Sequence, residues 1–412
     1  MNSCCSPDPA ALKPYEEAVA QLVAAAERIT EVERVPLGAA LGRVTASTVS
    51  SGINVPAWDY SAMDGYAVRT ADVGAADTTL PLSQRVPAGT APLPLEPRTA
   101  ARIFTGGPIP PGANAVVIQE VCREADGSVQ ILEQPTGGQN IRRTGEDIRQ
   151  GDEIIPAGTT LRPQHLGLAA SVGVAELEVV RRPRVALFST GDELLMPGQP
   201  LAPGKIYNSN LFTGTGLLQA LGCEVVPLGI VEDTLDATCD ALERGARDAD
   251  LVLASGGVSV GEEDYVKPAV EKLGSLDLWK IAIRPGKPLA FGHIADTPFI
   301  GAPGNPVSLF VTFLLFARPF IRTLQGCADP LTHTVTARAG FDWPRPDKRR
   351  EYIRARTYRG DDGELWVEAF PSRSSGVLSS VTWANALAII PENKALTRGD
   401  RLECIPFCEV DT

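Results

Sequence analysis

A regular alternation of apolar runs and helix-length segments over residues 184–324 is the feature that most constrains the fold. The runs RVALFS, CEVVPLG and DLVLASGG are typical of buried strands, and the segments between them have the length and pattern of helices. Strands that alternate with helices of about 10–15 residues form βαβ units. The pattern therefore predicts a central parallel α/β sheet with helices on both faces, closed by a long helix at about 307–324.

The rest of the chain has a different texture. Residues 14–28 place apolar side chains at helical spacing and predict an amphipathic helix. Residues 51–148 contain short β-like runs separated by proline and glycine clusters, which indicates a small β-rich module. The segment 149–180 returns to a mixed pattern. After residue 326, four short runs separated by turn residues predict a small all-β domain; they are TVTARAG, REYIRARTYR, LWVEAF and NALAIIP.

Charge and hydropathy exclude several classes of protein. The chain has 38 Lys and Arg against 50 Asp and Glu, a net charge of -12, whereas a general binder of nucleic acid or anionic membranes carries the opposite balance. The longest apolar run, at 307–317, is 11 residues long, short of the roughly 20 that cross a bilayer. No signal peptide is visible, so we expect a cytoplasmic protein that binds neither nucleic acid nor membrane.

Cysteine and histidine usage argues against disulfides and zinc. The eight cysteines are scattered without a C-x-x-C pair, and none of the three histidines has a cysteine or another histidine nearby. We therefore expect reduced thiols, with no zinc site and no local Cys–His motif.

Three loops that follow strands of the predicted sheet are rich in glycine and charge. Ligands of open parallel sheets bind beyond the carboxyl ends of the strands, where such loops meet. Glycine-turn amides suit phosphate oxygens, carboxylates suit Mg²⁺, and cations neutralise phosphate charge. Each loop also has a purely structural explanation, because Asp192 and Glu193 can cap a helix and the lysines can be solvated. The candidate residues are Glu193, Gly256, Gly257, Ser259, Asp264, Lys280, Arg284 and Lys287.

Two familiar nucleotide motifs are disfavoured. Gly256 and Gly261 have the spacing of a P-loop, but Glu262 stands where that motif requires lysine. The GTG at 214–216 lacks the third glycine of a dinucleotide-binding turn, because Gln219 occupies its place.

A second group of candidates lies in the β-rich module. Asp64 precedes Gly65 at a predicted turn, Thr105 lies near glycine amides, and the run QNIRRTGEDIRQGD contains Arg142 and Asp147. Taken alone, each is more typical of a turn or a solvated surface than of a catalytic site.

Seven strings, taken together, resemble the molybdopterin molybdenumtransferase family, the bacterial MoeA type whose relative forms the carboxy-terminal part of gephyrin. They are SAMDGYAV, IFTGGPIPPGANAVV, QNIRRTGEDI, STGDEL, SGGVSVGEEDY, WKIAIRPGKP and GAPGNPVS. They occur in family order from about residue 10 to 326, with weaker similarity in the last 85 residues.

The resemblance implies four domains. The first is elongated and discontinuous, 1–50 with 149–182, and the β-rich domain 51–148 is inserted into it. The α/β domain, 183–326, is similar to the molybdopterin adenylyltransferases, and 327–412 forms a β-barrel. The family forms homodimers in which the inserted domain of one subunit faces the α/β domain of the other.

The implied activity is insertion of molybdate into adenylylated molybdopterin, with Mg²⁺-dependent release of AMP. The resemblance places Asp64, Thr105, Arg142, Asp147, Lys280 and Arg284 in catalysis, Gly256, Gly257, Ser259, Lys287, Pro303 and Pro306 in binding the pterin intermediate, and Glu193, Asp233 and Asp264 at the metal. Arg284 replaces a lysine of many relatives, and a planar guanidinium orients an anion differently from an ammonium group.

Two alternatives stay open at the level of sequence. A molybdopterin adenylyltransferase shares the α/β domain, although the extra domains argue against it, and such an enzyme is also a possible partner of this protein. A gephyrin-like scaffold without catalysis is the other, although the acids at positions 64, 193 and 264 argue against a decayed site. The sequence does not distinguish molybdate from tungstate.

Overall fold

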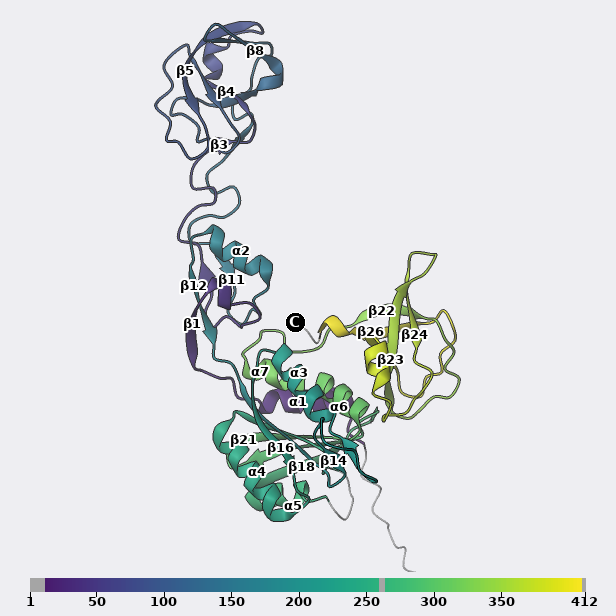
Figure 1. Cartoon of the computed structure of the whole chain (residues 1–412). Helices are drawn as coiled ribbons and strands as arrows, with labels where there is room; N and C mark the ends of the chain where they lie inside the picture. Colours follow the sequence, from purple (N-terminus) through teal and green to yellow (C-terminus); the bar gives the residue numbers. More distant parts are fainter. Residues whose placement is uncertain (1–11, 259–263, 410–412) are drawn as a thin grey trace, which may run out of the picture.

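The computed structural model describes residues 12–258 and 264–409. Figure 1 shows an elongated molecule: a small β-rich unit lies at one end, a narrow connecting unit in the middle, and an α/β unit at the other end with a β-barrel beside it. This arrangement confirms the predicted fold class of a central α/β domain, an inserted β-rich unit and a carboxy-terminal barrel.

The α/β unit is built on a six-stranded sheet in the order β16-β13-β17-β21-β20-β18. The first four strands are parallel, as predicted for β13, β16 and β17. The fourth, β21, was not predicted as a strand, and β20 and β18 are antiparallel to their neighbours. Only two residues separate β20 from β21, too few for the crossover that a parallel pair needs. The strands are β13 (Arg184–Thr190), β16 (Glu224–Val231), β17 (Leu251–Ser255), β18 (Gly274–Lys280), β20 (Pro288–Ile294) and β21 (Thr297–Ala302).

Helices cover both faces of this sheet. Successive residues of β13 point to opposite faces, so Leu187 packs into one apolar core and Phe188 into the other, and both are fully buried. One face is covered by α4 (Leu235–Asp248) and α5 (Val266–Leu273). The other is covered by α1 (Tyr15–Ala25), α3 (Asn210–Ala220), α6 (Pro306–Thr312) and α7 (Arg318–Leu324).

The helical stretch Pro306–Leu324 joins α6 and α7 through a π-helical segment, Phe313–Ala317. Within the described ranges, it is the one helix long and apolar enough to span a membrane. Of its apolar window, 94% is buried inside the protein, so its composition is that of a core helix.

The carboxy-terminal unit is a closed five-stranded barrel. Its strands pair in the order β23-β24-β22-β26-β25, and β25 pairs back with β23. The strands are β22 (Val335–Ala339), β23 (Arg350–Arg359), β24 (Leu365–Ala369), β25 (Ala386–Ile390) and β26 (Arg401–Pro406), with the short α8 (Ser379–Trp383) before β25. Of these strands, β26 was not predicted. A two-residue strand from the α/β unit, β19 (Ile283–Arg284), adds in parallel to β23 and ties the barrel to the sheet.

The connecting unit is built from segments far apart in the chain. Here β1 (Val32–Pro36) pairs with β12 (Glu176–Val180), and β2 (Val49–Ser50) pairs with β11 (Glu153–Ile155), beside α2 (Pro163–Ser171). The chain between β2 and β11 forms the β-rich unit at the far end (Figure 1).

The β-rich unit contains a six-stranded sheet in the order β7-β4-β6-β5-β9-β8. Its strands are β4 (Gly65–Val68), β5 (Thr78–Val86), β6 (Ala100–Ile103), β7 (Ala115–Ile118), β8 (Cys122–Ala125) and β9 (Ser128–Ile131). Two short pairs complete the fold: β3 (Tyr60–Ser61) with β10 (Ile141–Arg142) in this unit, and β14 (Leu194–Leu195) with β15 (Ile206–Tyr207) in the α/β unit.

Replacing Phe188 by alanine tests the two-faced core. The ring is fully buried beneath α4, so Phe188→Ala should lower the free energy of unfolding by about 3–5 kcal/mol. Phe212→Ala, on α3, is the matched control, because that ring is 54% exposed and its loss should cost under about 0.5 kcal/mol. Urea unfolding followed by circular dichroism measures both, and similar midpoints for the two variants would contradict this account of the core.

Candidate functional site

A cavity of about 710 Å³ lies beyond the carboxyl ends of the parallel strands. Parallel strands end at the same edge of a sheet, so the loops after β13, β16, β17 and β21 all reach it. Residues that these loops contribute to its wall are Thr190, Gly191, Glu193, Asp233, Gly256, Gly257, Val258, Asp264, Pro303, Gly304 and Asn305. The structure thus brings together most of the candidates predicted for the α/β unit.

The double glycine after β17 shapes the floor of this cavity. Both residues have positive φ, +98° for Gly256 and +66° for Gly257. A Cβ at Gly257 would lie 2.4 Å from Val266 Cγ2, so no side chain fits there. The backbone N–H of Gly256 donates to the carbonyl of Ala302, at 3.0 Å, so it is not available to bind a ligand. The absence of a side chain at this residue still lets a ligand approach the backbone closely.

The three predicted metal ligands line the same cavity. Glu193 follows β13, Asp233 follows β16, and Asp264 follows the glycine turn. The Asp233 carboxylate also accepts a hydrogen bond from the backbone N–H of Asp192, at 3.1 Å, which orients it. Within 12–258 and 264–409, no three His, Cys, Asp or Glu side chains are close enough together to form a metal cluster by themselves.

Two of the three predicted cations reach the cavity. Arg284 and Lys287 line it, on either side of Gly286. Lys280 is not among the lining residues: it ends β18 on an exposed site, and its carbonyl accepts from the N–H of Lys13 at 2.8 Å. Lys280 is the last residue of β18, whereas Arg284 and Lys287 lie in the segment between β18 and β20, which reaches the cavity.

The barrel supplies cations and hydroxyls that were not predicted. Because β19 pairs with the start of β23, the barrel loops lie against the cation loop of the α/β unit. Arg349, Arg373, Ser374 and Ser375 line the cavity from the barrel side. The arginine-rich run KRREYIRAR and the string SRSS were visible in the sequence, but no local pattern indicates that they face the sheet.

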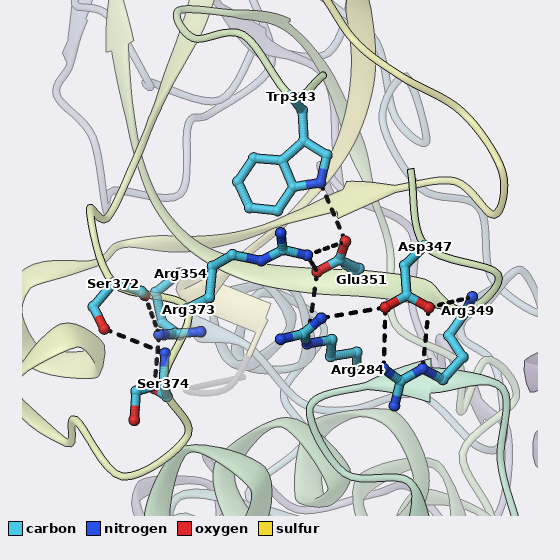
Figure 2. A network of polar contacts seen from close by, with 9 residues as sticks. All are labelled: Arg284, Trp343, Asp347, Arg349, Glu351, Arg354, Ser372, Arg373 and Ser374. Carbon is cyan, nitrogen blue, oxygen red and sulfur yellow. Dashed lines mark hydrogen bonds and ion pairs between the residues drawn. The ribbon is translucent and has the colours of Figure 1, made fainter. Parts of the chain in front are cut away.

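Two carboxylates of the barrel hold three of the guanidinium groups in place (Figure 2). Asp347 accepts two hydrogen bonds from the Arg349 guanidinium, at 3.0 and 3.1 Å, one from the Arg349 backbone N–H at 3.0 Å, and one from Arg284 at 3.2 Å. The hydrogen bonds from Arg349 hold the pKa of Asp347 well below its ordinary value. Asp347 therefore stays ionised and keeps both arginines oriented.

The second carboxylate, Glu351, is 2% exposed. It accepts from Arg373 at 2.6 Å and from the indole N–H of Trp343 at 3.1 Å, and it lies 3.9 Å from Arg284 (Figure 2). The Arg373 guanidinium also stacks over the Trp343 ring, 4.4 Å from its centroid. Three guanidinium groups share two carboxylates, so the network retains a net positive charge beside the cavity.

Arg354 shapes the barrel loop that reaches the cavity. Its guanidinium donates to the carbonyls of Ser372, at 2.6 Å, and Ser374, at 3.0 Å (Figure 2). The side chain is nearly fully buried, so these bonds hold the loop that carries Arg373 and Ser374 in a defined position.

The remaining predicted residues lie in or near the β-rich unit. Asp64 accepts hydrogen bonds from both the backbone N–H and the hydroxyl of Thr105, each at 2.8 Å, and these bonds lower the pKa of Asp64. Arg142 lies on β10, 3.4 Å from the Tyr60 hydroxyl, and Asp147 is exposed. Figure 1 shows this unit at the opposite end of the molecule from the α/β unit, whose loops form the cavity. Within one chain, these residues and the cavity do not meet.

Three further candidates have simple outcomes. Ser259 lies outside the described residues. Pro303 lines the cavity, and Pro306 is the first residue of α6, at a second, adjoining cavity.

Among the cysteines, burial raises the pKa values of Cys223 and Cys404 to about 12, so both remain protonated at neutral pH and are unsuited to nucleophilic catalysis.

The fold and cavity define a class of multidomain protein in which an α/β sheet presents an acid- and cation-lined cleft to a β-barrel, with a β-rich unit inserted far away. Three regions of the chain match known protein families, and their order follows this layout. Residues 13–173 match the MoeA N-terminal region (domain I and II), 186–323 a probable molybdopterin binding domain, and 336–407 the MoeA C-terminal region (domain IV).

Whole-chain comparisons agree. The chain is 39% identical over 383 residues to the molybdopterin molybdenumtransferase of Haemophilus influenzae, covering 92% of this chain and 94% of that protein. It is also 39% identical over 393 residues to molybdopterin molybdenumtransferase 2 of Mycobacterium tuberculosis, covering 92% and 95%. The crystal structure of the molybdopterin biosynthesis MoeA protein from Pyrococcus horikoshii OT3 superposes with a TM-score of 0.84 at 30% identity, over 96% of this chain and 100% of that one. The chain therefore belongs to the molybdopterin molybdenumtransferase family, which confirms the resemblance seen in its sequence.

Gly286 offers a test of how tightly the cation loop is built. Its φ is +96°, and an added Cβ would lie 2.5 Å from Cγ2 of Thr312, which is buried on α6 and cannot move aside. Gly399 is the matched control, because its φ is +97° and nothing lies within 4 Å of an added Cβ. Both alanine variants carry the strain of a positive φ, so Gly286→Ala should cost about 1–3 kcal/mol more in the free energy of unfolding. Equal losses in chemical denaturation would show that the loop has room to adjust.

Proposed function

We propose that this protein inserts molybdate into adenylylated molybdopterin and releases AMP. The observation that carries the proposal is one cavity, at the carboxyl edge of the sheet, with carboxylates on the sheet loops and cations on the barrel side. A phosphoanhydride and a tetrahedral oxyanion both need positive charge close to their oxygens. Membership of the molybdopterin molybdenumtransferase family supports the same assignment.

The cations of the cavity bind and orient the anions. Lys287 and Arg284 lie beside the glycine turns, where a phosphate can approach the backbone closely. Arg349 and Arg373 bring two more positive groups from the barrel. At 4 Å and an effective dielectric constant near 20, each such contact is worth about 4 kcal/mol before desolvation is subtracted. Several cations acting together therefore hold a multiply charged ligand that a single one could not.

The carboxylate set fits Mg²⁺. Glu193, Asp233 and Asp264 are oxygen donors on three loops of one cavity, and Mg²⁺ commonly takes only one or two carboxylates, filling its remaining positions with water and substrate phosphates. A compact three-residue cluster is not required for that mode. These residues would hold the ion, which when bound supplies charge neutralisation at the phosphoanhydride. The cations of the cavity stabilise the negative charge that develops on the departing AMP.

A homodimer explains the distant residues. The unit that contains Asp64, Thr105, Arg142 and Asp147 lies at the opposite end of the molecule from the α/β unit of its own chain (Figure 1). In a two-fold dimer the same unit can face the cavity of the other subunit. There Asp64, held by Thr105, and Asp147 would orient water or the incoming oxyanion.

The proposal extends to the cellular setting of the protein. We place the protein in the cytoplasm, where a molybdopterin adenylyltransferase would make the adenylylated substrate and pass it to this enzyme. The net charge of -12 disfavours a general role at nucleic acids or anionic membranes.

Removal of one cation tests the proposal. Purified protein with adenylylated molybdopterin and Mg²⁺ should release AMP faster when molybdate is present. The substitution Lys287→Ala should slow that release about 100-fold, because it removes a positive charge beside the phosphoanhydride that is cleaved. Lys267→Ala, on the exposed side of α5, is the control and should release AMP at the normal rate. A wild-type protein whose AMP release does not respond to molybdate would overturn the assignment. Formation of the adenylylated product from ATP and molybdopterin would instead identify an adenylyltransferase.

Mixed dimers test the sharing of sites between subunits. Asp64→Ala and Asp264→Ala should each be nearly inactive alone, because every site in either homodimer lacks one carboxylate. Random reassociation of the two makes roughly half of the dimers mixed, each with one intact site of two, so about a quarter of wild-type AMP release should return. Light scattering would measure the dimer independently. No recovery in mixtures shown to contain mixed dimers would place each complete site within one chain.

A further inference from the structure

One face of the sheet in the β-rich unit carries two arginines that share an aromatic ring. Arg102 on β6 pairs in register with Tyr66 on β4 and with Arg85 on β5, so the three side chains lie on the same face. Both guanidinium groups lie over the ring of Phe104, which follows β6, at 4.7 Å for Arg85 and 4.8 Å for Arg102 from its centroid. Arg102 also lies over the Tyr66 ring, at 4.9 Å. The rings therefore hold two positive charges close together.

Neither guanidinium forms an ion pair with any residue that the structure describes. Arg102 donates to two neutral acceptors, the carbonyl of Gly65 at 3.1 Å and Oε1 of Gln119 at 2.7 Å, and most of its N–H donors remain available. Arg85 is exposed, and its side chain makes no hydrogen bond within 12–258 and 264–409. The carboxylate of Glu124 accepts from the Tyr66 hydroxyl instead, at 2.6 Å. Two like charges held this way repel each other, and an anion bound between them would relieve the repulsion.

The two arginines lie beside Asp64. The carbonyl that Arg102 contacts belongs to Gly65, the residue after Asp64. Thr105, whose N–H and hydroxyl hold the Asp64 carboxylate, directly follows Phe104. Those hydrogen bonds lower the pKa of Asp64, and the charge of Arg102 adds to the effect. An ionised Asp64 alone would repel an anion, whereas the carboxylate and two guanidinium groups together carry a net positive charge.

We propose that Arg85 and Arg102 form an anion-binding site beside Asp64 and receive a tetrahedral oxyanion there. The inference rests on the proposed function, in which the β-rich unit of one subunit faces the cavity of the other and the ligands are anions. Two sources have this chemistry, the incoming molybdate and a phosphate of the adenylylated pterin, and both present oxygens to guanidinium N–H groups. The rings of Phe104 and Tyr66 position the two cations without neutralising them, so their charge stays available to the ligand.

Four variants test the site. Arg85→Met and Arg102→Met each remove a charge and keep an apolar stem. Arg102→Lys keeps the charge but not the planar guanidinium. Arg356→Met is the matched control, because Arg356 is an exposed arginine of the barrel that lies 4.8 Å from the Trp383 ring centroid, donates to the Trp383 carbonyl and has no ion pair with a described residue. Thermal unfolding establishes that each variant is folded.

The side-chain Nε–H resonances of the arginines report anion binding at each position by NMR. Protein labelled with ¹⁵N-arginine is titrated with molybdate, and separately with inorganic phosphate, against sodium chloride of equal ionic strength; the methionine variants assign the signals. At least one oxyanion should shift the Arg85 and Arg102 signals to saturation and leave that of Arg356 in place. In Arg102→Met, half-saturation of the Arg85 signal should need about 10-fold more anion, because one charged donor group is lost. Shifts that do not saturate, or that chloride reproduces, would overturn the inference.

The kinetics of AMP release distinguish the two sources of the anion. An increase of about 10-fold in the KM for molybdate alone, in Arg85→Met and Arg102→Met, would assign the site to the oxyanion. The same increase for the adenylylated pterin alone would assign it to the phosphate, and Arg102→Lys should recover part of either loss. Unchanged KM values for both substrates, or an equal increase in Arg356→Met, would contradict a role in binding.

The NMR titration requires no turnover, so it separates this inference from the proposed function. Arginine signals that ignore both oxyanions would remove the site while molybdate-stimulated AMP release by the wild type stands. A wild type whose AMP release ignores molybdate would overturn the proposed function, and saturable shifts at Arg85 and Arg102 would still establish the anion site.

Discussion

Parallel alignment of β16, β13, β17 and β21 is the constraint on which the rest of the structure depends. It sends four loops to one edge of the sheet, and each loop contributes residues to the wall of the cleft. The strands hold this alignment because both faces are buried, as the divided packing of Leu187 and Phe188 illustrates. If the strands of this sheet lost their register, the acids and the glycine turn would no longer lie at the same edge.

A short backbone pairing completes the cleft. The two residues of β19 align with Arg350 and Glu351 of β23, and this contact brings a separate barrel against the cation loop. The guanidinium groups gathered there would repel one another without Asp347 and Glu351, whose hydrogen bonds orient them (Figure 2). Positive charge is thus concentrated on the barrel side and negative charge on the sheet side, an arrangement suited to an anion bridged to a cation.

The architecture separates tasks by distance. The β-rich unit stands at the end of a narrow connection, at the opposite end of the molecule from the α/β unit (Figure 1). The cavity that contains the arginines adjoins a second cavity of about 550 Å³, whose wall includes no arginine or lysine, and the two share Thr190, Glu193, Gly304 and Asn305.

Much of this molecule could be predicted from local sequence. A strand buried on both faces requires a run of apolar residues, and a positive φ, as at Gly257, favours glycine. The helices that cover the sheet, the strands β13, β16 and β17, and the acids at the strand ends follow from that pattern, whereas α2 and α8 were not predicted. The pairing of distant strands is not indicated by residue type, because it is made by backbone hydrogen bonds that do not depend on the side chain. The reversal of β20, the strand β26, the exclusion of Lys280 and the entry of Arg349 and Arg373 into the cleft were therefore decided only by the tertiary structure.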